Sequence, residues 1–133
     1  MSKLLERLQD PARSGVYRVT RSDAIDEAMR DAAQIDLKDG DALRAIAQAL
    51  RFPDWFGANW DALEDCLGDL SWRPGDGHVL VFRNWQALTS DDLGVLIDVL
   101  RSSAESWSGR GKPFFAVLID PQARLALPPL HRE

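Results

Sequence analysis

The chain has 133 residues, 45% of them apolar and 28% charged, as in a soluble protein of one globular domain with its own core. Its 21 acidic and 16 basic residues give a formal charge of −5, which disfavours direct binding to nucleic acid, since that needs a basic surface. The single cysteine, Cys66, excludes an internal disulfide, and the charged N-terminus and the lack of a long apolar run predict a cytoplasmic protein without a secretory signal or membrane span.

The first third of the chain predicts mixed local structure. Residues 1–14 are rich in charge and end near a proline, which indicates a short helix or an arm. Residues 16–19 have the composition of a short edge strand. Ser22 or Asp23 can cap a helix that runs to about Ala33.

A strand and a helix follow. Residues 34–38 alternate apolar and polar side chains, as in a strand with one buried face, and a turn at Asp39-Gly40 ends it. Asp41 caps a predicted helix over 41–50 with one apolar face. The helix should end before Pro53, because the residue that precedes a proline avoids the helical region.

The charge of the chain is concentrated between Phe52 and Trp72. This stretch holds five acidic residues and no Lys or Arg, so the remainder has 16 acids against 16 bases. It also holds three of the five tryptophans: Trp55, Trp60 and Trp72. A neutral body with one acidic, aromatic segment is the main indication of function.

A helix over 59–70 is predicted within this stretch. Asn59 is a favourable N-cap, and apolar residues at helical spacing form a buried stripe: Trp60, Leu63, Leu67 and Leu70. The acids fall on the opposite side, with Asp61, Asp65 and Asp69 at i, i+4 and i+8 and Glu64 beside them.

The remaining elements predict an α/β protein. Residues 79–82 and 114–119 are continuously apolar, as in strands covered on both faces, and Ser90 can cap a helix over 90–107. Strands separated by helices favour a small parallel sheet packed with helices. We expect strands near 34–38, 79–82 and 114–119 at its centre and 16–19 at an edge, followed by an irregular tail.

The acidic face allows two interpretations. It is a solvated surface, or it is a site for a cationic partner. Like charges four residues apart destabilise a helix, and Asp69 lies near the C-terminus, where the helix dipole disfavours an anion. The loop before the helix favours the second interpretation, because Trp55 and Phe56 lie beside the acids, as aromatic anchors do in protein interfaces. We expect Phe56 in the core and Trp55 at least partly exposed.

The run from Trp55 to Leu67, WFGANWDALEDCL, resembles the signature of the barstar family of ribonuclease inhibitors. The signature is an aromatic pair, Gly, any residue, Asn, an apolar residue and then Asp-Ala-Leu-x-Asp-Cys-Leu. The resemblance covers roughly residues 34–119, which we take as the core of a single domain over 1–133. Residues 1–33 are then an N-terminal extension and residues 120–133 a tail.

The resemblance implies a barstar-like fold and an inhibitor that acts stoichiometrically, as an antitoxin or immunity protein, and not an enzyme. Its acidic helix and the loop before it would block the active site of a basic ribonuclease. Asp65 would be the central phosphate mimic, Asp61 the flanking one and Trp55 the aromatic that packs on the enzyme's catalytic His, while Gly57 and Asn59 shape the loop. The expected partner surface comprises Trp55, Asn59, Asp61, Glu64, Asp65 and Asp69, on a free monomer.

Two residues depart from the family pattern. Glu64 stands where better-known members have an aromatic residue. Ser102 aligns where members carry an acid on the following helix, with Asp98 and Glu105 nearby. The partner could therefore be another ribonuclease or another basic protein, for which the chain would be an adaptor or immunity protein.

Other functional readings have less support. A hydrolase that uses Asp61 and Asp65 would need a cleft between two carboxyl groups, and a metal site would need a ligand loop, so we predict no catalytic residue, no metal and no cofactor. His78 and His131 are expected at the surface, and Cys66 as a packed thiol. Gly75-Asp76-Gly77 is predicted to form a turn. Trp85 and Trp107 are expected in the core.

Overall fold

The computed structural model describes residues 3–21, 23, 32–54 and 56–130. The helix expected from Ser22 or Asp23 lies almost wholly outside these residues, and Ala33, its expected end, is the first residue of a strand instead. Within the described part of the chain, no helix is both long enough and apolar enough to cross a membrane.

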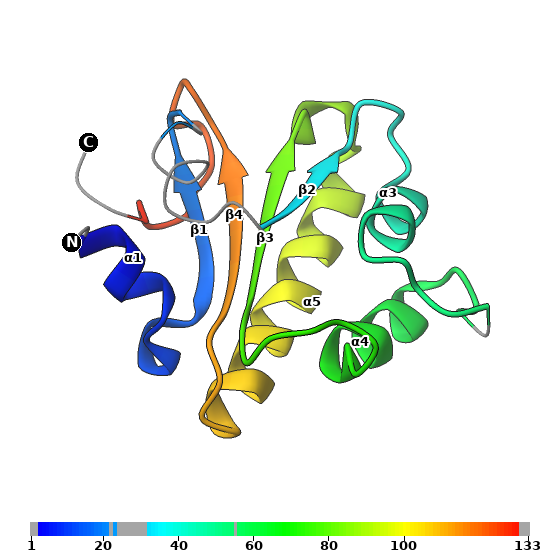
Figure 1. Ribbon diagram of the computed structural model, residues 1–133. Coiled ribbons are helices and arrows are strands. Elements are labelled where there is room, and N and C mark those ends of the chain that lie inside the picture. Colours follow the sequence, from blue (N-terminus) through cyan, green and yellow to red (C-terminus); the bar gives the residue numbers. More distant parts are fainter. Residues whose placement is uncertain (1–2, 22, 24–31, 55, 131–133) are drawn as a thin grey trace.

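Four parallel strands form the sheet, in the order β1-β4-β3-β2 (Figure 1). Their bounds are β1 Gly15–Val19, β2 Ala33–Asp36, β3 His78–Arg83 and β4 Phe114–Ile119. The predicted parallel α/β fold and the N-terminal edge strand are confirmed. β2, however, is the opposite edge and not a central strand, which fits its alternating burial, whereas β3 and β4 are almost wholly buried.

Three helices cover one face of the sheet: α3 Ala42–Ala49, α4 Trp60–Asp69 and α5 Ser90–Gly109. Side chains of even-numbered residues in β3 and β4, such as Leu80, Phe82 and Phe114, pack against them. The N-cap of α5 is Thr89 and not Ser90, because the Thr89 hydroxyl accepts the Asp92 amide N–H at 3.1 Å. The buried positions of Trp85 and Trp107 are confirmed.

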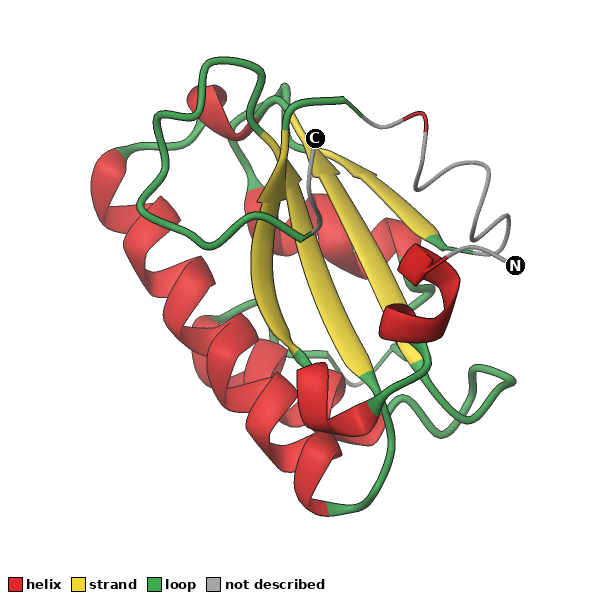
Figure 2. Cartoon of the chain, turned by 90° about the vertical axis from the view of Figure 1, so that its left-hand side faces the viewer, coloured by secondary structure: helices red, strands yellow, loops and turns green. Residues whose placement is uncertain are grey.

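The N-terminal segment and the tail cover the other face (Figure 2). The short helix α1, Lys3–Leu8, buries Leu4 and Leu8 against odd-numbered residues of the central strands, and Leu130 of the tail joins them. Both central strands are therefore covered on both faces, as their continuous apolar character predicts.

The tail also protects an edge of the sheet. The Arg18 amide donates to the carbonyl of Pro128, and the Leu130 amide donates to the carbonyl of Arg18, both at 3.0 Å. The chain after β4 thus pairs with the outer side of β1 at one bridge, which removes unpaired backbone groups from that edge.

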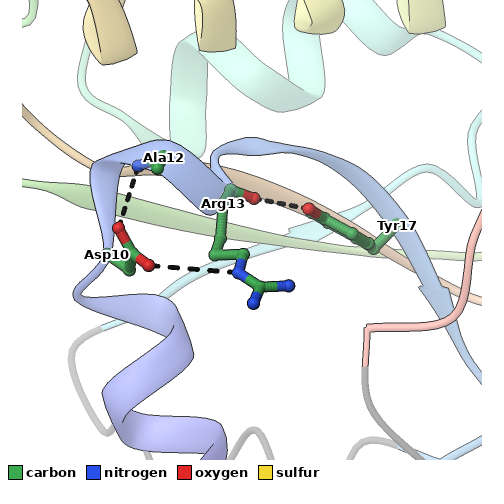
Figure 3. A network of polar contacts seen from close by, with 4 residues as sticks. All are labelled: Asp10, Ala12, Arg13 and Tyr17. Atoms are coloured by element: carbon green, nitrogen blue, oxygen red, sulfur yellow. Dashed lines mark hydrogen bonds and ion pairs between the residues drawn. The ribbon is translucent and has the colours of Figure 1, made fainter.

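The connection between α1 and β1 is held by local polar contacts (Figure 3). Asp10 caps the 3-10 helix η1, Pro11–Arg13, by accepting the Ala12 amide at 3.0 Å. Its other oxygen lies 4.0 Å from Nε of Arg13, and the Tyr17 hydroxyl donates to the Arg13 carbonyl. These contacts fix the direction in which the chain enters β1.

The prediction that His78 lies at the surface is wrong. His78 is the first residue of β3, is only 5% exposed, and its ring packs edge-on against Trp107 with 4.9 Å between ring centroids. Burial lowers the pKa of His78 to about 4, and the positive charges of Arg73, Lys112 and Arg110 act in the same direction. The ring is therefore neutral at pH 7.

Acidification is expected to destabilise the fold through this histidine. Its pKa is about 4 in the folded protein against 6.5 for an unperturbed histidine, so between these values the unfolded state binds a proton that the folded state does not. The free energy of unfolding is therefore unaffected by this group above pH 6.5. It decreases as the pH falls toward 4, by up to about 3 kcal/mol.

Urea denaturation of the wild type and of His78→Gln between pH 7 and pH 4 measures this effect. The variant lacks the titrating group and should lose less stability over the same interval. An equal loss in both proteins would show that His78 does not carry the effect.

Candidate functional site

Helix α4 is delimited by its own sequence. The Asn59 side chain accepts the Ala62 amide at 2.8 Å and so caps the N-terminus, as predicted. At the other end Leu70 adopts a left-handed conformation, with φ 48°, and its amide donates to the carbonyl of Cys66. The helix buries Leu63, Cys66 and Leu67, while Trp60 is partly buried.

The acidic side chains of α4 are all exposed: Asp61, Glu64, Asp65 and Asp69. None of the ion pairs formed among the described residues involves them. A weak hydrogen bond from the Ser71 hydroxyl to Asp69, at 3.3 Å, is the polar contact that the side chain of Asp69 makes within the described part. The outer face of α4 is thus a row of exposed carboxylates.

The loop before α4 contains two residues with left-handed backbone, Arg51 with φ 53° and Ala58 with φ 51°. Gly57, expected as the turn glycine, is not in that conformation; the strained residue is the next one, Ala58. Both residues carry a Cβ, so each costs about 1 kcal/mol relative to glycine. The two strained residues flank the loop from Phe52 to Gly57. The sequence gives no sign of the strain.

Trp55, the expected interface aromatic, lies outside the described residues. Its neighbour Phe56 is partly buried against the core, as expected, and meets Phe52 edge-on at 4.9 Å between ring centroids. Phe52 in turn meets Trp72 edge-on at 5.8 Å. Aromatic contacts therefore support the loop from beneath.

Trp72 closes the whole acidic stretch. Its indole N–H donates to the carbonyl of Leu50 at 2.9 Å, across 22 positions of sequence. Leu50 is the C-cap of α3, so the bond also satisfies a carbonyl at the end of that helix. The sequence marks Trp72 only as an aromatic at the end of the stretch, and no local pattern reveals its partner.

Two residues near the end of α5 hold the last turn of α4. The Trp107 indole donates to the carbonyl of Leu67 at 2.7 Å, and Nη2 of Arg110 donates to the carbonyl of Gly68, also at 2.7 Å. The Arg110 guanidinium lies 3.9 Å from the centroid of the Trp107 ring. These donors satisfy carbonyls at the negative end of the α4 dipole, next to the carboxylate of Asp69.

Cys66 lies on the inner side of α4, as expected for a packed thiol. Burial raises the pKa of the Cys66 thiol, and the negative charges of Asp65 and Asp69 raise it further. The thiol is therefore protonated at neutral pH and is a poor nucleophile.

Helix α5 also carries exposed acidic residues. Asp98 is exposed and lies 4.0 Å from Arg101 of the same helix, and Ser102 and Glu105 are also exposed. Among the described residues, no three His, Cys, Asp or Glu side chains are grouped so that they could hold a metal ion. What the α4 surface offers is negative charge on a rigid support, which suits recognition of cations.

A known protein family matches about two thirds of the chain. The family described as Barstar (barnase inhibitor) matches residues 31–119. This range includes β2, β3, β4 and all three helices of the packed face, and it excludes β1 and the tail. A search of the curated proteins finds no match to the chain.

Replacement of Trp107 with Phe is expected to loosen the last turn of α4. The variant keeps an aromatic ring but leaves the Leu67 carbonyl without its donor, which should lower the free energy of unfolding by about 1–3 kcal/mol. The backbone amide of Leu70, bonded to the Cys66 carbonyl, should exchange its hydrogen faster.

Trp85→Phe is the matched control, because the Trp85 indole donates in the same way to the carbonyl of Ile119, at 2.9 Å. It should lower global stability without accelerating exchange at Leu70 beyond the global change. If both variants affect Leu70 alike, the support of α4 by Trp107 is not specific.

Proposed function

The chain belongs to the barstar family, and from that premise we propose that it is a stoichiometric protein inhibitor of a ribonuclease. The family consists of inhibitors and not enzymes, and its partners are ribonucleases. The observation that carries the proposal is the row of exposed carboxylates on α4, which form no ion pair among the described residues and lie inside the matched range.

Ribonuclease active sites bind a phosphate backbone and therefore present cationic groups. Carboxylates on a rigid helix can occupy the phosphate positions and form charge-assisted hydrogen bonds there. In this proposal Asp65 is the central phosphate mimic and Asp61 the flanking one. Glu64 and Asp69 extend the negative surface, and Trp55 packs on the enzyme beside them.

The supports described above explain why such a surface could bind without reordering. Asn59 caps one end of α4, and Trp107 and Arg110 hold the other. Side chains on a fixed helix lose less entropy on binding than side chains on a mobile loop. The inhibitor would act as a cytoplasmic monomer whose α4 face is free, and it needs no cofactor.

A departure from the pattern bears on the choice of partner. Glu64 is exposed on the same face as Asp65, where better-known members carry an aromatic residue. An extra carboxylate in place of an apolar ring favours an enzyme with a larger cationic surface at this position. Affinity capture with the purified chain would identify the enzyme, and capture of a basic protein without ribonuclease activity would replace this proposal by that of an antitoxin for another toxin.

Asp65→Ala is expected to weaken inhibition of the captured ribonuclease by about 30-fold or more. Removing one member of a buried, hydrogen-bonded charge pair costs about 2–5 kcal/mol, because the enzyme's cation is left unpaired. The side chain of Asp65 is exposed and makes no hydrogen bond among the described residues, so the fold should be unaffected. Inhibition constants from a fluorogenic RNA substrate, with circular dichroism as the folding check, measure both.

The matched control is Asp39→Ala, which removes one exposed carboxylate from the turn between β2 and α3. It changes the net charge equally and should leave inhibition within about twofold. Normal inhibition by a folded Asp65→Ala protein would refute the assignment of the site.

The association rate is expected to fall steeply with salt. Long-range attraction between an acidic surface and a cationic active site accelerates encounter, and its range shortens from about 10 Å at 0.1 M ionic strength to about 3 Å at 1 M. Stopped-flow measurements over this range should show a slope that becomes shallower in Asp61→Asn. A rate that is independent of salt would exclude electrostatic steering by α4.

A further inference from the structure

A cavity of about 490 Å³ lies where β3 and β4 begin, and none of the carboxylates of α4 line it. Three segments form its walls. The N-terminal segment contributes Leu8 and Pro11, the loop before β3 contributes Asp76, and the turn between α5 and β4 contributes Arg110 and Lys112. The volume falls within the range of about 300–1,000 Å³ that is usual for small-molecule sites.

Cationic groups predominate among the charged side chains of this cavity. Arg110 and Lys112 stand against the single acid Asp76. Lys112 is exposed and forms no ion pair among the described residues. Arg110 binds the Gly68 carbonyl through Nη2, and its Nη1 forms none of the hydrogen bonds found in that part of the chain. Donors for an anion are therefore available.

His78 also lines the cavity and adds a buried polar group. It is 5% exposed, yet its ring nitrogens form none of the hydrogen bonds found among the described residues. Among the described residues, the fully buried polar atoms without a partner are Nε of Arg7 and Nε of Arg73, so the ring nitrogens of His78 keep contact with solvent and are available to a ligand.

Two walls of the cavity are fixed against each other. The His78 amide donates to the Pro113 carbonyl at 3.0 Å. A Cβ added to Gly77 would come within 2.5 Å of Cγ of Pro113, so only glycine permits this approach. The cavity is thus formed before any ligand arrives, which lowers the entropic cost of binding.

We propose that this cavity binds a small organic anion, with one carboxylate or phosphate group on a compact apolar body. Lys112 and the free edge of Arg110 would receive the charged group. The apolar side chains of Leu8, Pro11 and Pro113 would contact the body. This site uses none of the carboxylates of α4, although it shares Arg110 with the support of that helix.

The test is a titration of the full chain, labelled with ¹⁵N, with benzoate and with phenyl phosphate at constant ionic strength. Saturable shifts are expected at the backbone amides of Gly77, His78, Gly111 and Lys112. The tighter of the two probes identifies the preferred charged group. Benzyl alcohol, which has the same ring without the charge, should bind at least tenfold more weakly.

Lys112→Ala should weaken binding of the tighter anion by about tenfold, because a hydrogen bond to a charged group is lost. The side chain is exposed, so the variant should fold. Lys38→Ala, which removes an exposed lysine near the end of β2, should leave affinity unchanged. No saturable shift with either anion, equal binding of benzyl alcohol, or an equal effect of the two lysine variants would each overturn the proposal.

Discussion

The indole N–H of Trp72 donates to the carbonyl of Leu50, and on this contact the arrangement of the acidic stretch depends. It holds the end of the acidic stretch against the end of α3. The two ends of the segment between Leu50 and Trp72 therefore lie together. Within this segment, the ring of Phe52 packs against the rings of Phe56 and Trp72. Without the contact, the stretch would lose the hydrogen bond that joins its end to the end of α3.

The second support of α4 comes from a distant part of the chain. Trp107 lies 40 positions after Leu67, and Arg110 lies 42 positions after Gly68, yet both donate to carbonyls of the last helical turn. A helix that displays several like charges repels itself and gains little from its own sequence. Donors at its C-terminus offset part of this cost by opposing the negative end of the dipole. Packing and hydrogen bonds to α5 thus sustain a surface that the local sequence would not.

The sequence predicts well those features that depend on neighbouring residues. The caps at Asp41 and Asn59, the buried stripe of α4 and the two continuous apolar strands all follow from local patterns, and the structure confirms them. What it could not predict depends on long-range contacts. The ring of His78 is buried against Trp107, which lies 29 positions later in the chain. The place of β2 at an edge depends on the order in which the strands pair. For the site, the exposure of the acids was predictable, whereas the donors that fix their helix were not.

The closure at Leu50 and Trp72 has a consequence for how this protein could diversify. A segment whose two ends meet can change residues, and even length, at small cost in loop entropy and without rebuilding the strands beneath it. Substitutions between these two residues would then change what the surface binds, while the sheet maintains the fold. Antibody loops vary on their framework in the same way. Glu64 is an exposed residue of this segment. In a protein of this fold, changes in recognition would then accumulate first between Leu50 and Trp72.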